Sequence, residues 1–391
     1  MNEGIRPLIL LVMIAIASLA AWNGSLLVRD NPHDGWVVHA ASAPRAGRSD
    51  PTLPQKQEIL ALLKKANAWQ LAHPIMKPDD RNWERATWYT GVMAAWKATQ
   101  ERPFLDQALA WGRQHQWQVG TESAGANRLF CVETWAELYF VQKDPAMIAP
   151  AVQWLATPDP ISPAGGKWWY ADPYATKSVY ADSLYGASAL AMLAKATGDA
   201  KYIDIMNAFF DDVTAQLLDR ESGLYYRDAR FIGQRTARGK KILWSRGNGW
   251  VFAGIARILE YLPRNHPSRK RYLEIFQRQA GELIKRQGAD GLWRVNLDDP
   301  DQFPNPETSG TGFFCFGLAW GINQGVLNRH TYLPAVERAW KGLAQSLSPE
   351  GEVLWGQHGD DEPHLVERNS TEEFVTGTFL LAGSEAYKLA P

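Results

Sequence analysis

Three short stretches recur along the chain: ESGLYY at residues 221–226, ADGLWR at 289–294 and EGEVLW at 350–355. Each stretch contains a glycine and follows a segment whose apolar residues recur at helical spacing. A Gly-centred turn that returns every 60 to 70 residues, as these do, is typical of repeated helical hairpins. The three stretches therefore predict a fold built from helix pairs.

About twelve segments of the chain have helical periodicity, whereas strand-like alternation appears only in short pieces. The predicted helices are residues 54–72, 82–100, 103–118, 127–142, 146–156, 178–196, 200–219, 248–262, 268–287, 310–326, 331–346 and 371–387. Twelve helices make six hairpins. An open array would need a polar final helix as a cap, but residues 374–383 are mostly apolar. We therefore predict an all-α fold in which six hairpins close into a double ring, with short β segments in the loops.

Composition excludes several classes of protein. Among 391 residues, 41 Lys and Arg stand against 42 Asp and Glu, so the net charge of −1 lacks the basic excess of a nucleic-acid-binding protein. The two cysteines, Cys131 and Cys315, lie far apart, and the eight histidines show no metal-ligand spacing. We expect no nucleic acid, no disulfide and no metal, and we expect both cysteines to be buried.

The amino terminus differs from the rest of the chain. Residues 8–22 (LILLVMIAIASLAAW) are uncharged, follow Arg6, and are shorter than the roughly 20 residues of a membrane span. Ser18 and Ala20 form an acceptable cleavage pattern. We predict that residues 1–22 are an export signal or an uncleaved membrane anchor, that 23–50 are a linker and that 51–391 are one folded domain. The protein is then periplasmic, secreted or membrane-anchored, and its oligomeric state is unknown.

The unusual polar and aromatic residues gather at the starts of the even-numbered predicted helices. They fall in residues 85–91, 127–133, 182–185, 244–250, 307–312 and 371–374. If the even-numbered helices form the inner ring, their six amino termini open at one end. Free N–H groups and positive helix-dipole ends favour an anionic ligand there. We therefore expect a funnel-shaped binding site at that end.

The stretch WSRGNGW, residues 244–250, carries a candidate sugar site. Arg246 can pair with a carboxylate, and Trp244 and Trp250 can face sugar rings. Asn248 lies between two glycines and can cap the following helix. The alternative is a capped helix start with packed tryptophans and an arginine salt bridge.

Asp182 is the candidate proton donor. It lies in YADSLY, residues 180–185, in the first turn of the sixth predicted helix, and the preceding KWWYADPY, residues 167–174, predicts an aromatic wall around it. The helix terminus would lower the pKa of Asp182 and burial would raise it. Only a raised pKa suits proton donation near neutral pH. The alternative is a solvated surface carboxylate.

Two further acidic stretches have simpler interpretations. Glu307 and Thr308 begin ETSGTG, residues 307–312, which can cap a helix or meet a substrate carboxylate with backbone N–H groups. Asp360 and Asp361 follow Trp355 and are interpreted as solvated loop charges.

Together these residues resemble the unsaturated uronyl hydrolases of glycoside hydrolase families 88 and 105, and more closely the unsaturated rhamnogalacturonyl hydrolases of family 105. The similarity runs from about Asn82 to Lys388. It is carried by WERATWYTGVMA (residues 83–94), by residues 244–250, by ETSGTGFF (307–314) and by TGTFLLAGSE (376–385). The resemblance implies an (α/α)6 barrel and an exo-acting enzyme that needs no cofactor and acts on oligosaccharides left by polysaccharide lyases.

The resemblance also implies a reaction. An Asp protonates C4 of a nonreducing-end uronate with a C4–C5 double bond, water adds at C5, and the hemiketal opens and expels the remaining sugar. Asp182 matches this Asp. The sugar-contacting motif is matched by Trp244, Arg246, Asn248 and Trp250, and Trp88 of the first stretch is expected in the funnel.

One stretch departs from the family pattern. Near the fourth helix the family has Ala-Asn/Asp-Asp and then Gly-Gln-Thr-aromatic. In this chain Arg128 or Asn127, depending on the alignment, replaces the second acidic residue, and Glu133 replaces the Gln. Arg128 could bind an additional anionic group, and Glu133 could restore a carboxylate. Two alternatives stay open. One is hydrolysis of a saturated uronide by two carboxylates, Asp182 with Glu133 or Glu307. The other is a noncatalytic oligosaccharide-binding protein.

Overall fold

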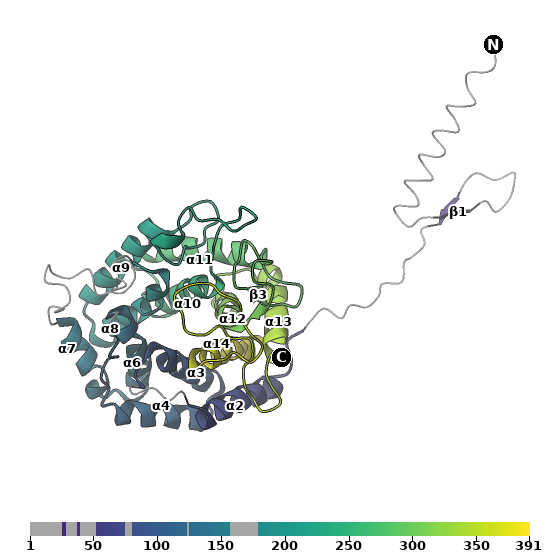
Figure 1. The fold of residues 1–391 in the computed structure, drawn as a ribbon. Helices are drawn as coiled ribbons and strands as arrows, with labels where there is room; N and C mark the ends of the chain where they lie inside the picture. The colour runs from purple at the N-terminus through teal and green to yellow at the C-terminus, as the bar shows by residue number, and fades with distance from the viewer. Residues whose placement is uncertain (1–25, 29–36, 40–51, 75–79, 123–124, 157–178) are drawn as a thin grey trace, which may run out of the picture. The chain divides into compact units, whose positions relative to one another are not determined.

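A computed structural model of the chain describes residues 26–28, 37–39, 52–74, 80–122, 125–156 and 179–391 (Figure 1). The chain divides into two units, Met1–Asp50 and Pro51–Pro391. In the first unit, β1 (Leu26–Val28) pairs antiparallel with β2 (Val37–His39). The predicted export signal or membrane anchor at residues 1–22 and the predicted aromatic wall at 167–174 lie outside the described residues. Within the described ranges, no helix is long and apolar enough to cross a bilayer.

The second unit is a ring of helices surrounded by another ring (Figure 1). The inner helices are α3 (Trp83–Thr99), α6 (Phe130–Gln142), α8 (Ala187–Thr197), α10 (Ser245–Tyr261), α12 (Thr308–Asn323) and α14 (Glu373–Leu389). The outer helices are α2 (Lys56–Ala72), α4 (Arg102–Gln114), α7 (Ala149–Ala156), α9 (Lys201–Leu217), α11 (Arg269–Ile284) and α13 (Arg329–Gln345). Each inner helix packs on the next, and α14 packs on α3. The all-α (α/α)6 barrel is confirmed.

Ring closure depends on a close approach between the first and last inner helices. A Cβ atom added to Gly91 of α3 would lie 2.4 Å from the backbone oxygen of Gly377 in α14. A Cβ atom on Gly377 would lie 2.4 Å from the backbone oxygen of Thr87. Since real Cβ atoms do not approach other atoms so closely, both positions require glycine for the two backbones to meet.

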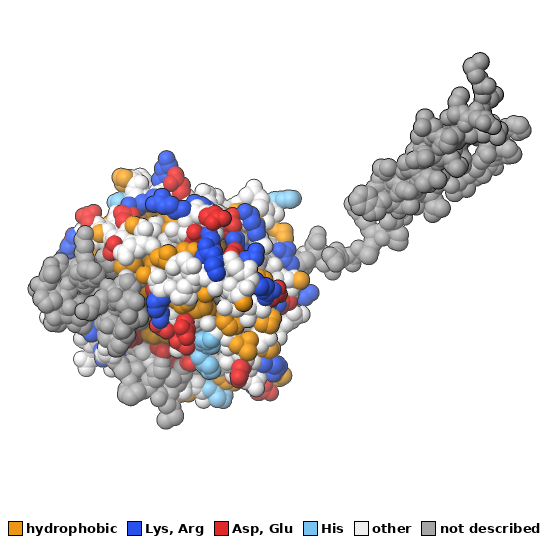
Figure 2. Space-filling model, turned by 45° about the horizontal axis from the view of Figure 1, so that its top comes forward, with side chains coloured by type: hydrophobic (Ala, Val, Ile, Leu, Met, Phe, Trp, Pro, Cys, Tyr) orange, Lys and Arg blue, Asp and Glu red, His pale blue; other side chains and the backbone are white. Residues whose placement is uncertain are grey.

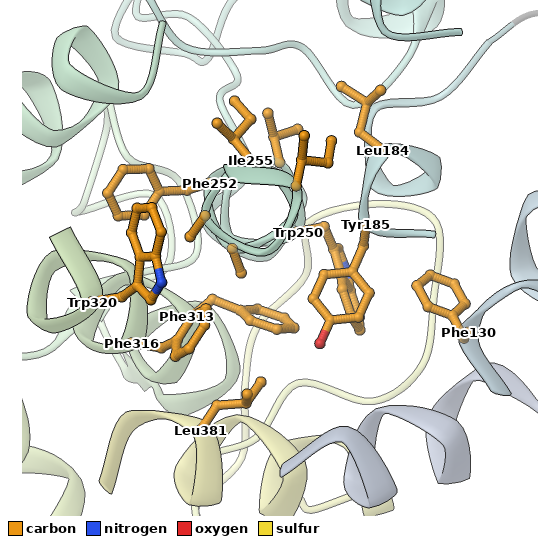
Figure 3. Packing of buried hydrophobic residues seen from close by; sticks show 14 of the residues in the cluster. Phe130, Leu184, Tyr185, Trp250, Phe252, Ile255, Phe313, Phe316, Trp320 and Leu381 are labelled. Carbon is orange, nitrogen blue, oxygen red and sulfur yellow. The ribbon is translucent and has the colours of Figure 1, made fainter. Parts of the chain in front are cut away.

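The inner helices are buried nearly all round, as expected for the core of a double ring. In α12, all residues from Thr308 to Ile322 are buried. Figure 3 shows aromatic side chains of several inner helices meeting inside the ring, with Phe313 from α12 beside Trp250 from α10. Cys131 and Cys315 are buried free thiols. On the outside, Figure 2 shows basic and acidic side chains interspersed over one face of the molecule.

The three recurring stretches form the same turn after α9, α11 and α13. Gly223, Gly291 and Gly351 occupy it with φ of 72°, 86° and 110°. An antiparallel bridge or short strand follows in each case, including β3 (Trp293–Arg294), which pairs with β4 (Pro306–Glu307). The predicted short β segments are therefore present. The other short elements are α5 (Gly125–Arg128), η1 (Pro145–Met147), η2 (Ala181–Tyr185) and η3 (Ala229–Phe231).

Several predicted helix starts differ from the structure. The predicted helix 127–142 divides into α5 and α6, and α10 starts at Ser245 rather than at residue 248. The predicted helix 178–196 begins only at Ala187, after the 3-10 turn η2. A tertiary contact causes this delay, because Ala181 donates its backbone N–H to the backbone oxygen of Arg227 and Tyr180 bridges Asp228.

Candidate active site

A cavity of about 660 Å³ lies where inner helices begin. Its described lining residues are Trp83, Glu84, Thr121, Glu122, Asn127, Phe130, Tyr180, Asp182, Arg227, Arg246, Trp250, Gly359, Asp360 and Asp361. The volume falls within the roughly 300–1,000 Å³ of small-molecule sites. The starts of α3, α6 and α10 and the turn before α8 all contribute side chains. Segments that are distant in sequence thus converge on one site, as the funnel prediction requires.

Asp182 lies in η2 and not in the first turn of an α-helix, and its side chain is 14% exposed. Its Oδ2 atom lies 3.5 Å from Nε of Arg227, and Oδ1 has no hydrogen-bond partner in the part of the chain that the structure describes. Burial raises the pKa of Asp182, and this outweighs the opposing effects of Arg227 and Arg246. A carboxyl with a raised pKa can hold a proton and donate it near neutral pH.

Arg246 is a buried cation on the cavity wall, 1% exposed. Nη1 donates to the backbone oxygens of Gln357 and His358 at 2.7 and 2.8 Å, and Nη2 donates to that of Asp360 at 3.0 Å. Burial lowers the pKa of Arg246 to about 10, so the side chain stays charged at neutral pH. Its three hydrogen bonds go to neutral carbonyls, which leave the positive charge available to an anionic ligand.

The tryptophans of WSRGNGW divide between two roles. Trp250 lines the cavity and packs against Trp83 and Phe313, with ring centroids 5.7 and 4.4 Å apart. Trp244 does not line the cavity. Its ring lies 4.4 Å from the guanidinium of Arg246, and its Nε1 donates to Oε1 of Gln357 at 2.7 Å. Trp250 can therefore contact a sugar, whereas Trp244 supports Arg246.

Four other predicted residues have structural positions outside the cavity lining. Trp88 is in the core, where its Nε1 donates to Oδ1 of Asn67 at 2.9 Å. The N-cap prediction for Asn248 is wrong, because α10 starts three residues earlier. The Asn248 side chain instead accepts a hydrogen bond from the backbone N–H of Tyr225 at Oδ1 and donates one from Nδ2 to the backbone oxygen of Tyr225. Glu307 caps α12, and Thr308 donates its hydroxyl to the backbone oxygen of Leu354.

The residues that depart from the family pattern, Asn127, Arg128 and Glu133, lie in different surroundings. Asn127 lines the cavity, whereas Arg128 does not and donates from Nε to the backbone oxygen of Glu122 at 2.6 Å. Glu133 is fully buried, and its Oε2 accepts from Nε of Arg257 at 2.7 Å. Glu133 therefore does not restore a carboxylate to the cavity, since it belongs to an ion pair within the ring.

Several cavity residues were missed in the sequence. Arg227 and Tyr180 are the most important, and Arg227 directly follows the first recurring stretch, a position that could have drawn attention to it. Asp360 and Asp361 are not isolated solvated charges, since both line the cavity and Asp361 pairs with Arg230 at 2.8 Å. No local motif marks them, because the long segment between α13 and α14 brings them to the cavity.

Comparison with known proteins agrees with this architecture. The family model described as Glycosyl Hydrolase Family 88 matches residues 55–390. An unsaturated 3S-rhamnoglycuronyl hydrolase of Formosa agariphila is 34% identical over 85% of this chain and 91% of its own, and one of an Alteromonas species is 41% identical over 53% and 50%. A glycosyl hydrolase family 88 structure from Bacteroides vulgatus superposes with a TM-score of 0.76 at 29% identity, over 86% of this chain and 99% of the other. The chain therefore belongs to glycosyl hydrolase family 88 and is a glycoside hydrolase.

Proposed function

We propose that the enzyme removes an unsaturated uronic acid from the nonreducing end of lyase-generated oligosaccharides by hydrating its C4–C5 double bond. One observation carries this proposal: a buried carboxyl with a raised pKa, Asp182, shares a cavity with the fixed cation of Arg246. The first group can transfer a proton, and the second can hold the uronate carboxylate. Two relatives named unsaturated 3S-rhamnoglycuronyl hydrolases support this substrate class.

The reaction needs only water as a second reactant. Protonated Asp182 gives its proton to C4, and the positive charge that develops at C5 is relieved as water adds there. The added water returns a proton to the Asp182 carboxylate. The resulting C5 hemiketal opens by cleavage of its bond to the ring oxygen, which leaves a ketone at C5 and a hemiacetal at C1. The hemiacetal then collapses to an aldehyde and releases the remaining sugar as an alcohol. Arg246 pairs with the C5 carboxylate, and Trp250 lies at the wall of the same cavity.

Loss of the ultraviolet absorbance of the double bond measures the proposed reaction. We expect turnover by the wild type and by the control Asp106→Asn, whose side chain is 56% exposed on α4. Asp182→Asn should show no turnover and an unchanged Tm. Release of an intact saturated uronic acid, or turnover by Asp182→Asn, would contradict the proposal.

The relatives' names further favour rhamnose as the sugar that is released. We therefore propose an unsaturated uronyl-rhamnose as the preferred substrate, over an unsaturated uronyl-galactose or uronyl-glucose. A panel of purified disaccharides compared by kcat/KM tests this preference. A tenfold preference for a sugar other than rhamnose would reject it.

Export is proposed separately, from the uncharged run at residues 8–22. We expect the full chain in the periplasm, medium or membrane fraction, and a chain without residues 1–22 in the cytoplasm. Cell fractionation followed by mass spectrometry of the amino terminus distinguishes a cleaved signal from an anchor. Cytoplasmic location of the full chain would contradict this proposal.

A further inference from the structure

A series of alternating charges runs from Asp182 to the loop over the cavity. Asp182 lies next to Arg227, and Arg227 contacts Asp228. Arg230 contacts both Asp228 and Asp361. The series passes from the buried cavity wall to the cavity mouth, since the Asp182 and Arg227 side chains are 14% and 8% exposed and that of Asp361 is 41% exposed.

Arg227 is shared unequally among three acidic neighbours, of which Asp361 is the most distant at 3.9 Å from Nη1. Its Nη1 lies 2.8 Å from Oδ2 of Asp228, the length of a strong charge-assisted hydrogen bond. Its Nε lies 3.5 Å from Oδ2 of Asp182, which is beyond such a bond. The guanidinium also lies 5.0 Å from the ring of Tyr180. Arg227 is therefore committed to Asp228 more than to Asp182.

Asp228 is itself held firmly in place. It is 1% exposed and accepts hydrogen bonds from the backbone N, Nε and Nη2 of Arg230 in addition to the bond from Arg227. Burial opposes its charge, but these bonds outweigh burial and keep the pKa of Asp228 below its usual range. Asp228 therefore remains a fixed anion over the pH range of an enzyme assay.

We propose that Asp228 is a positioning residue that holds Arg227 away from Asp182 and thereby lets Asp182 keep its proton for transfer. The proposal rests on the function proposed above. Without the Asp228 charge, Arg227 would become a full ion-pair partner of Asp182 and would stabilise its carboxylate form. An opposite charge in direct contact lowers the pKa of an Asp by roughly 1–3 units.

Other charged groups face Asp182 across the cavity. Arg246 comes from α10, Glu84 from α3, Glu122 from the segment before α5, and Asp360 and Asp361 from the loop between α13 and α14. Arg246 is bonded to three loop carbonyls, so its position does not depend on Asp228. Arg227 lowers the pKa of Asp182 and Asp228 raises it. Removing the charge of each residue in turn therefore separates these two opposing effects.

The first experiment follows the ionisation of Asp182 directly. Carbon-13 NMR of Asp-labelled protein, with the Asp182 signal assigned by its absence in Asp182→Asn, gives the pKa without any substrate. We expect Asp228→Asn to lower the pKa of Asp182 by about 1 unit or more and Arg227→Gln to raise it. The charge of Asp228 also raises the pKa of Asp182 directly. Asp228→Asn should therefore lower this pKa by more when Arg227 is present than in the double variant, and an equal effect in both backgrounds would show that Asp228 does not act through Arg227.

The second experiment follows turnover. The high-pH limb of kcat/KM reports loss of the Asp182 proton, so it should move to lower pH in Asp228→Asn and to higher pH in Arg227→Gln. The matched control is Asp219→Asn, which removes a carboxylate paired with Lys241 at 2.6 Å outside the cavity lining. Its high-pH limb should stay where the wild-type limb lies.

A merely structural Asp228 predicts different results. In that case Asp228→Asn lowers the Tm, the pKa of Asp182 does not move, and the two single variants do not shift in opposite directions. An unmoved Asp182 pKa, or single variants that do not shift it in opposite directions, overturns the proposal in folded protein. Absence of turnover by the wild type would instead reject the proposed function, and the NMR titration would still decide the role of Asp228.

Discussion

Tyr180 donates its hydroxyl to Oδ1 of Asn127 across 2.8 Å at the edge of the cavity. Asn127 lies in the stretch that departs from the family pattern, and the bond from Tyr180 engages its acceptor atom. The amide NH2 group of Asn127 is left to serve as a donor to whatever occupies the cavity. An ionised carboxylate at this place could only accept hydrogen bonds, so the amide adds a donor to this wall.

Tyr180→Phe removes the bond that orients Asn127. A typical hydrogen bond contributes about 0.5–1.5 kcal/mol, so kcat/KM should fall by up to about tenfold. The control is Tyr139→Phe in α6, which loses only a 3.3 Å bond to the backbone oxygen of Ala196. Steady-state kinetics of both variants measure the difference. Equal kcat/KM values for Tyr180→Phe and wild type would show that Asn127 needs no orientation.

Gly247 provides space for Asp182 in the first turn of α10. A Cβ atom there would lie 3.3 Å from Oδ1 of Asp182 and 3.2 Å from the Trp244 ring. Gly247→Ala should therefore displace Asp182 and reduce kcat on the order of tenfold or more, since small misplacements at a reacting centre slow catalysis strongly. The matched control is Gly281→Ala in α11, where the nearest atom is the Tyr332 hydroxyl at 3.8 Å.

Gly281→Ala should leave kcat unchanged and raise stability by up to about 1 kcal/mol, as expected when Ala replaces Gly within a helix. Thermal unfolding and kcat measured on the same preparations test both variants. An active Gly247→Ala enzyme would mean that Asp182 tolerates displacement.

Arg246→Lys should weaken both substrate binding and the loop over the cavity. An ammonium cannot reproduce the forked geometry that reaches the oxygens of Gln357, His358 and Asp360. We expect kcat/KM to fall roughly hundredfold, equivalent to about 3 kcal/mol, and protease cleavage within 356–372 to become faster. Arg269→Lys is the control, because Arg269 also bonds two carbonyls, those of Leu259 and Leu262, outside the cavity lining.

Kinetics and limited proteolysis separate the two variants. Arg269→Lys should retain wild-type kcat/KM and the wild-type cleavage pattern of the loop. Unchanged kcat/KM in Arg246→Lys would contradict the assignment of Arg246 to the substrate carboxylate.

Glu133→Ala should affect stability rather than chemistry. Removing one partner of a buried ion pair costs about 3–5 kcal/mol, because Arg257 loses its bond at 2.7 Å and keeps a longer one to Glu137 at 3.3 Å. Urea unfolding should show this loss, while kcat per folded molecule stays within about twofold of wild type. If Glu133→Ala had normal stability but no turnover, Glu133 would have a role in catalysis instead.

Glu133 should also make stability depend on pH. Burial raises its pKa to about 7, although Arg257 opposes the shift. A group whose pKa is higher in the folded state adds stability below its unfolded pKa and loses that contribution as pH rises through the folded value. The stability of the wild type relative to Glu133→Gln should therefore fall between pH 5 and pH 8. Urea unfolding at both pH values checks this, and a rise over that range would contradict the raised pKa.

Much of the fold could be predicted from local sequence, because helical periodicity and turn glycines are local properties. The three recurring stretches were recognised by their glycines, and in the structure each of these glycines has a positive φ. Helix starts were less predictable. Residues 180–182 look helical, but a backbone bond to Arg227 holds them out of α8. Asn248 looks like a cap, but the tertiary contact with Tyr225 engages its side chain.

The sequence by itself determined the helix pairs, their number and the clustering of polar residues at inner-helix starts, since each follows from residues close together in the chain. Tertiary structure alone decided which of those residues face the cavity. Trp250 and Asp182 do, whereas Trp88, Glu133 and Glu307 are turned into packing, an ion pair and a helix cap. Spacing along a chain places a residue on a helix, but ring closure decides which neighbour that helix face meets. The juxtaposition of Asp182 with Arg227 therefore exists only in the folded ring.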